Sequence, residues 1–151
     1  GDLAGEVDAR LAAVELASFQ GTFADFAGLL EETMAIAEEI GYPTGLAKGG
    51  WLLGTLAFIN RQYTLSIQHL VRSIALWREL DQPYALAAAL NTLAASLMED
   101  HQYAVARDIL QEAAEINRSL GQRDFYPFVL SEDILSKLKL VHTLVAPKGG
   151  R

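Results

Sequence analysis

The sequence contains no cysteine, which excludes disulfide bridges, thiol nucleophiles and cysteine metal sites. No stretch approaches the roughly 18 consecutive apolar residues that a membrane-spanning helix needs. The N-terminus also lacks the charged and then apolar pattern of a secretory signal peptide. Together these absences predict a protein of the reducing cytoplasm that has no membrane contact.

Basic residues are also scarce, since 12 lysines and arginines stand against 19 acids and give a net charge of −7. An acidic chain is a poor match for a phosphate backbone, so we expect no direct nucleic-acid binding. The charge is uneven along the chain. Residues 1–40 hold nine acids and a single base, Arg10, whereas residues 137–151 hold four bases and no acid.

Sequence motifs for catalysis are missing as well. There is no phosphate-binding glycine loop and no nucleophile elbow. The three histidines, His69, His101 and His142, have no histidine or acid four residues away that would form a metal-binding pair. The sequence therefore predicts no enzyme activity, no metal site and no cofactor.

The chain is long enough for one domain, and 51% of its residues are apolar, so a substantial core is possible. It begins at Gly1, and its first methionine is Met34. We interpret this start as that of a piece of a longer protein.

A repeat of 40 residues is the strongest positive signal. The segment "HQYAVARDILQEAAEINRSLGQ" matches "RQYTLSIQHLVRSIALWRELDQ", which pairs Tyr103 with Tyr63, and "QGTFADFAGLLEETMAIAEEIG" adds Phe23 at the same spacing. Leucine recurs at 30, 70 and 110. Because self-similarity at such a period is typical of repeat proteins, we expect stacked structural units.

Glycines and prolines divide these units into helices. Gly21, Gly41 and Gly121 stand where helices should end, and Pro43 and Pro83 stand where the next helices should begin. Apolar residues recur at helical spacing, and no strand-like alternation is present. The expected helices span about 4–20, 23–41, 44–60, 63–80, 83–100, 103–120 and 125–145.

The pattern of Leu53-Gly54 and Leu93-Ala94 in first helices, with "QYTLS" and "QYAVA" opening second helices, resembles the tetratricopeptide repeat. The long period is similar to that of bacterial signal-transduction ATPases and MalT-like transcription regulators. The resemblance implies an all-α, right-handed superhelical solenoid of about seven helices. Its hairpins would span about 4–41, 44–80 and 83–120, followed by a helix at 123–146 and a tail at 147–151. HEAT-type or armadillo-type repeats are the alternative fold.

The resemblance further implies a non-catalytic binding module in a larger bacterial regulatory protein, active in signal transduction or transcription regulation. The alternative is a structural spacer or oligomerisation segment without a groove ligand. First helices would line a concave face that takes a protein, a peptide or a small effector. The predicted concave-face residues are Leu11, Glu15, Lys48, Trp51, Thr55, Phe58, Asn91, Ala95 and Met98, with Asp8 and Ala88 beside them.

The C-terminal segment is apolar over more than half of its helical circumference. An array should end on a polar face, so this segment should pack either on a further repeat outside this sequence or on another copy of the chain. We expect a homodimer through it, with a head-to-tail contact between the basic end and the acidic first unit as the alternative. The predicted self-association residues are Phe128, Leu130, Ile134, Leu135, Leu138, Val141, Leu144 and Val145.

Overall fold

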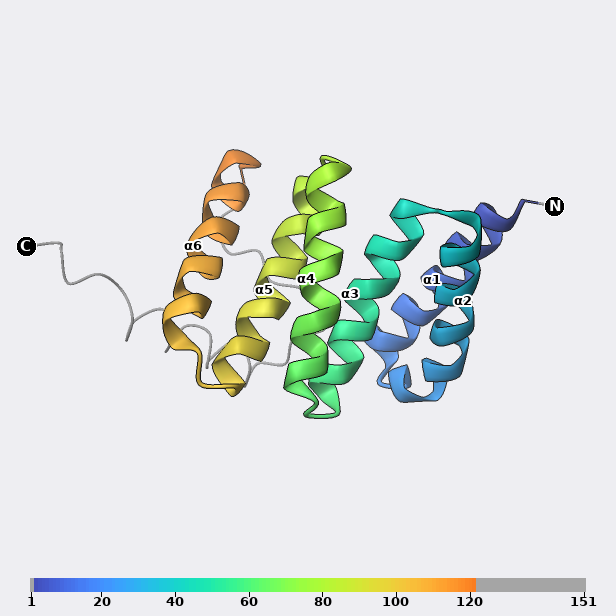
Figure 1. Cartoon of the computed structure of the whole chain (residues 1–151), viewed down its shortest axis with the longest axis horizontal. Helices are drawn as coiled ribbons and strands as arrows, with labels where there is room; N and C mark the ends of the chain where they lie inside the picture. Colours follow the sequence, from blue (N-terminus) through green and yellow to red (C-terminus); the bar gives the residue numbers. More distant parts are fainter. Residues whose placement is uncertain (1, 122–151) are drawn as a thin grey trace, which may run out of the picture.

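The computed structural model describes residues 2–121, and this part of the chain is entirely helical, without a strand. Its elements are α1 (Leu3–Gln20), the short 3-10 helix η1 (Phe23–Phe26), α2 (Ala27–Ile40), α3 (Pro43–Ile59), α4 (Tyr63–Glu79), α5 (Pro83–Glu99) and α6 (Tyr103–Ser119). Consecutive helices pack side by side along the long axis of the molecule (Figure 1). The expected all-α, solenoid-like fold is confirmed for the described residues. The expected seventh helix at 125–145 lies outside them.

The joints between helices recur at a fixed interval of 20 residues. The backbone adopts the left-handed conformation at Gly21, Gly41 and Gly121, and also at Arg61, Asp81 and His101. At each of the joints from residue 21 to residue 101, the next amide donates back to a carbonyl five residues earlier, as in Thr22 N to Ala17 O at 3.1 Å. This is the hydrogen bond of a Schellman cap, which satisfies a carbonyl at the helix end.

Arg61 occupies such a joint with φ of 61°, although a Cβ makes this conformation unfavourable by roughly 1–2 kcal/mol. We expect Arg61→Gly to raise the free energy of unfolding by about 0.5–1 kcal/mol, because relief of strain exceeds the added freedom of the unfolded chain. Urea titration checks this. Arg61→Ala is the matched control, since it removes the same exposed side chain but keeps the Cβ. An equal gain in both variants would show that the side chain, and not the backbone conformation, was responsible.

The second helix of the first hairpin starts later than predicted. Residues 23–26 form a 3-10 turn, and the α-helix begins only at Ala27. Phe26 stands at the repeat position that Ser66 and Ala106 fill with small, fully buried side chains. A phenyl ring does not fit that space, and the tighter 3-10 turn at this site is the local difference between the first hairpin and the others.

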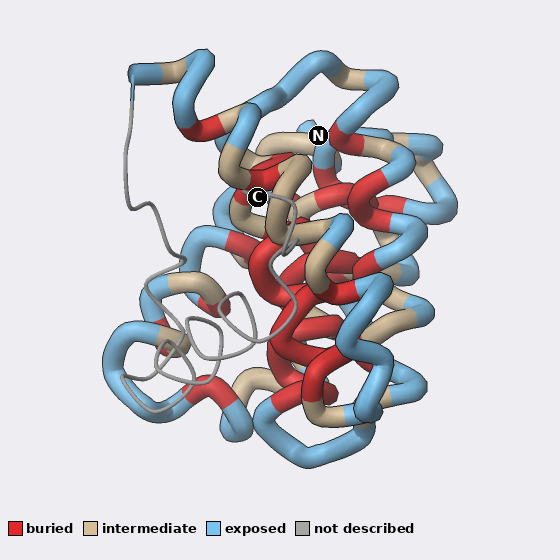
Figure 2. Tube along the Cα trace, turned by 90° about the vertical axis from the view of Figure 1, so that its left-hand side faces the viewer, coloured by how far each residue is buried: buried red, intermediate tan, exposed pale blue. Residues whose placement is uncertain are grey.

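The core runs as a continuous band through the stack, with exposed residues on the outer turns (Figure 2). Its fully buried side chains include Leu11, Leu30, Leu52, Leu70 and Leu90, so every helix from α1 to α5 contributes one. This is the arrangement expected of a repeat array, in which each unit buries its apolar face on the next.

Candidate functional site

The predicted concave-face residues lie mainly in α3 and α5, which are the most buried helices of the described chain. In α5, residues 89–98 are buried without interruption, so no side of these turns is open. Trp51, Thr55 and Phe58 in α3 are each less than a tenth exposed. The same holds for the remaining predicted apolar and amide residues, which are Leu11, Asn91, Ala95 and Met98. Binding by this set stays a prediction, and the structure gives its members packing roles.

Trp51 connects α3 to α5 through a hydrogen bond. Its indole Nε1 donates to Thr92 Oγ1 at 3.2 Å, and the Thr92 hydroxyl donates to Ala88 O at 3.1 Å. Thr55 Oγ1 donates to the Trp51 carbonyl at 2.8 Å. Because buried polar groups are costly unless they are bonded, these contacts fix the tryptophan in one orientation.

The charged members of the predicted face form polar contacts between α1 and the start of the second hairpin. Lys48 Nζ lies 2.6 Å from Glu15 Oε2, which joins α3 to α1, and both side chains are about one-third exposed. Asp8 accepts a hydrogen bond from the Tyr42 hydroxyl at 3.0 Å. Burial and this bond raise the pKa of the Tyr42 hydroxyl. The three acidic and basic groups of the predicted face therefore join α1 to the start of the second hairpin.

Two buried serines of α4 form contacts that the sequence analysis did not anticipate. Ser66 Oγ donates to Gly54 O at 2.8 Å and lies 2.7 Å from Ser96 Oγ, while Ser73 Oγ donates to Ala47 O at 2.6 Å. The sequence signal is that Ser66 shares its repeat position with Ala106, and Ser73 shares its own with Thr33 and Ala113. That pattern shows a small side chain but not its hydrogen bonds.

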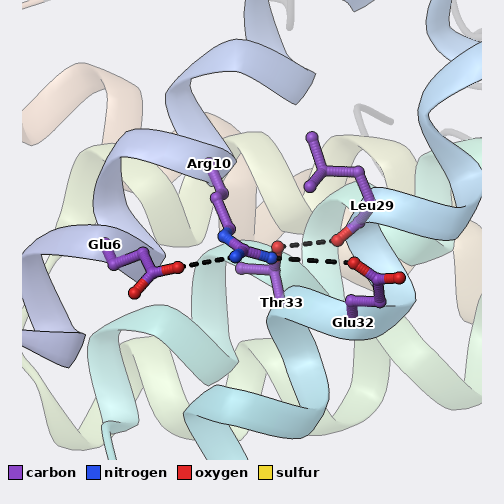
Figure 3. Close-up of polar contacts among 5 residues, drawn as sticks. All are labelled: Glu6, Arg10, Leu29, Glu32 and Thr33. Atoms are coloured by element: carbon purple, nitrogen blue, oxygen red, sulfur yellow. Dashed lines mark hydrogen bonds and ion pairs between the residues drawn. The ribbon is translucent and has the colours of Figure 1, made fainter.

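Ion pairs connect neighbouring helices on the outside of the stack. Arg10 lies between Glu6 of its own helix, at 2.6 Å, and Glu32 of α2, at 3.7 Å (Figure 3). Arg78 of α4 makes a two-pronged contact with Glu112 of α6, and this hydrogen bond lowers the pKa of the Glu112 carboxyl. These pairs are partly exposed, so each stabilises the stack only modestly.

The histidines of the described chain lie apart and in different surroundings. His69 is half-buried in α4, and burial followed by the nearby Arg72 charge lowers its pKa. His101 lies in an exposed joint, where Nδ1 is 2.9 Å from the Tyr103 hydroxyl. A zinc site needs three or four histidine, cysteine or carboxylate ligands around one point. Residues 2–121 contain no group of three such side chains that could hold a metal ion.

No helix within residues 2–121 combines the length and the apolar character needed to cross a membrane.

Fold and contacts together define an all-α array of helical hairpins, joined by buried hydroxyl bonds and outer ion pairs. A protein-family model matches the sequence over residues 19–144, which is more than half of the chain. The chain belongs to the Peptidase_Mx family, which is described as "putative zinc-binding metallo-peptidase". No curated protein and no solved structure matches the chain.

This family match overturns several expectations from the sequence. The tetratricopeptide-repeat assignment is wrong, because the family that matches is a metallopeptidase family. The predicted non-catalytic binding module in signal transduction or transcription regulation is contradicted on the same ground. So is the expectation that the chain has no enzyme activity. The physical reason is that small and large residues at helical spacing report stacked hairpins, which unrelated families share.

The zinc ion named in the family description does not fit the donor set of the described residues. The whole sequence has no cysteine and no H-E-x-x-H motif. Nearby Arg72 also places a positive charge close to His69, which opposes cation binding there. The predicted self-association residues between 128 and 145 lie outside the described residues, as does His142.

Proposed function

We propose that the chain takes part in zinc-dependent peptide hydrolysis and that the zinc ligands lie outside residues 2–121. The family match over residues 19–144 is the observation that supports the reaction class. The scattered donor set of α1 to α6 supports the second part of the proposal. In this view the helical array is the scaffold of the peptidase, and its partner is the polypeptide substrate.

The contacts between helices suit a scaffold role. The buried bond from Trp51 to Thr92 joins the second hairpin to the third, and the bond from Ser73 to Ala47 joins α4 to α3 within the second hairpin. On the outside, Glu38 lies 2.5 Å from Arg72 and links the first hairpin to the second. We also propose that the protein works in the cytoplasm and does not bind nucleic acid, which the lack of cysteine and the charge of −7 support.

Metal analysis of the complete chain tests this proposal. We expect purified protein, incubated with Zn²⁺ and dialysed, to retain zinc and to hydrolyse labelled casein in a chelator-sensitive way. The double variant His69→Gln with His101→Gln should keep both the zinc content and the hydrolysis. We expect this because neither imidazole has a second and a third potential zinc ligand beside it within residues 2–121.

His142→Gln is the variant to compare with this double variant, because it removes the one histidine outside residues 2–121. If the zinc ligands lie there, it should lower the zinc content. Loss of zinc in the His69 and His101 double variant, with the fold intact by circular dichroism, would contradict the placement of the ligands. A wild-type chain that neither retains zinc nor hydrolyses casein would contradict the proposed reaction.

A further inference from the structure

The outer face of α1 exposes positions that are covered in the other first helices. Ala9, Ala12, Ala13 and Leu16 are exposed, and Leu16 has 57% of its surface accessible. Forty residues on, in α3, the same positions are buried or half-buried, and in α5 all four are buried. Those counterparts are Gly49, Leu52, Leu53 and Leu56 in α3, and Ala89, Thr92, Leu93 and Ser96 in α5.

The α3 counterpart shows what kind of element covers this face. A methyl group placed on Gly49 would lie 2.0 Å from Met34 Sδ, so this side of α3 packs directly on α2, the second helix of the preceding hairpin. The exposed α1 face is therefore the repeat counterpart of this packing surface of α3. Its members are all apolar, whereas the end of a repeat array normally presents a polar face. An element that packs on this face needs an apolar stripe of its own, such as an amphipathic helix has.

The negative charge of the first hairpin indicates which charge a helix packed on this face should carry. Residues 1–40 carry nine acids and one base, and Arg10 already lies between Glu6 and Glu32 (Figure 3). Two copies of this hairpin placed face to face would bring two charges of −8 together, which is unfavourable. A helix with a basic end would be attracted instead.

One segment of this chain has the required composition. Residues 128–145 carry apolar side chains at helical spacing, with Glu132 and Asp133 near their start, and the C-terminal end is basic, since residues 137–151 contain four bases without an acid. We propose that the α1 face, formed by Ala9, Ala12, Ala13 and Leu16, is a self-association surface that binds residues 128–145 of a second copy of this chain. The pairing joins an apolar stripe to an apolar stripe and a basic end to an acidic hairpin.

Sedimentation of the complete chain tests the proposal. We expect a concentration-dependent oligomer whose dissociation constant rises at least about tenfold in Leu16→Glu, because a charge at the centre of an apolar contact is strongly unfavourable. The matched control is Val71→Glu, which places the same charge on an equally exposed position of α4, 54% accessible, outside the proposed surface. This control should change the dissociation constant less than about twofold.

Two further measurements identify the occupant. Raising the salt concentration from about 50 to about 500 mM should weaken the oligomer, since exposed charges are screened over shorter distances. Lys137→Glu combined with Lys139→Glu should weaken it as well. A strictly monomeric chain at high concentration overturns the proposal, and so does an oligomer that tolerates Leu16→Glu. An oligomer sensitive to Leu16→Glu but insensitive to salt and to the lysine changes overturns the assignment of its partner.

Discussion

Replacing Trp51 by alanine is expected to lower the free energy of unfolding by about 3–5 kcal/mol, the usual loss for a large aromatic side chain in a core. Trp51 is 8% exposed and belongs to the continuous core. The variant would leave a cavity between α3 and α5 and would also remove the bond from Nε1 to Thr92 Oγ1. Urea titration followed by far-UV circular dichroism measures the loss.

Trp51→Phe is the matched control for this expectation. It keeps an aromatic ring in the core but leaves the Thr92 hydroxyl without the indole donor, so we expect a smaller cost of about 1–2 kcal/mol. If Trp51→Ala were as stable as the wild type, the tryptophan would not be a core residue. The result matters for function, because a Trp51 variant would lose activity through unfolding. Loss of activity alone would therefore not show that Trp51 contacts the substrate.

Gly54→Ala is expected to destabilise the protein by about 1–2 kcal/mol, although alanine normally favours a helix over glycine by up to about 1 kcal/mol. A methyl group at Gly54 would lie 2.6 Å from Leu70 Cγ and 3.3 Å from the carbonyl oxygen of Ser66. Leu70 is fully buried, and the Ser66 oxygen is backbone, so neither can move away cheaply. Helices α3 and α4 would have to separate.

Gly28→Ala provides the control, because the same substitution in α2 meets no atom within 4 Å. Here only the helix preference remains, and we expect a gain of up to about 1 kcal/mol. Opposite signs for the two variants, measured by thermal unfolding and urea titration, would confirm the close approach of α3 and α4. Two gains would show that this approach is looser than described.

The sequence predicted the fold well because the fold depends on local signals. Glycine at 21, 41 and 121 marks helix ends through its left-handed conformation, and Pro43 and Pro83 begin helices. The 40-residue spacing of Phe23, Tyr63 and Tyr103 then predicts similar hairpins. Positions such as Arg61 gave no such signal, since an ordinary residue there adopts the same joint only because the repeat holds it.

The candidate site was much harder to predict, and the reason is physical. Helix α3 is apolar around almost its whole circumference, so the pattern could not show whether Trp51 faces a groove or a neighbouring helix. Lys48 and Glu15 looked like separate polar groups until the stack brought them within 2.6 Å. A missing motif was also taken to mean a missing activity, but zinc ligands can come from distant parts of a chain or of a larger assembly.

The regular joints have a consequence for how this chain can change in length. Because the backbone turns in the same way at Gly41, Asp81 and Gly121, removing or duplicating residues 42–81 would rejoin the chain at an equivalent turn. A change of 20 residues would instead exchange a first helix for a second and place the polar side of one against the apolar side of the other. Insertions and deletions in this chain are therefore expected to preserve the fold when they comprise whole 40-residue hairpins.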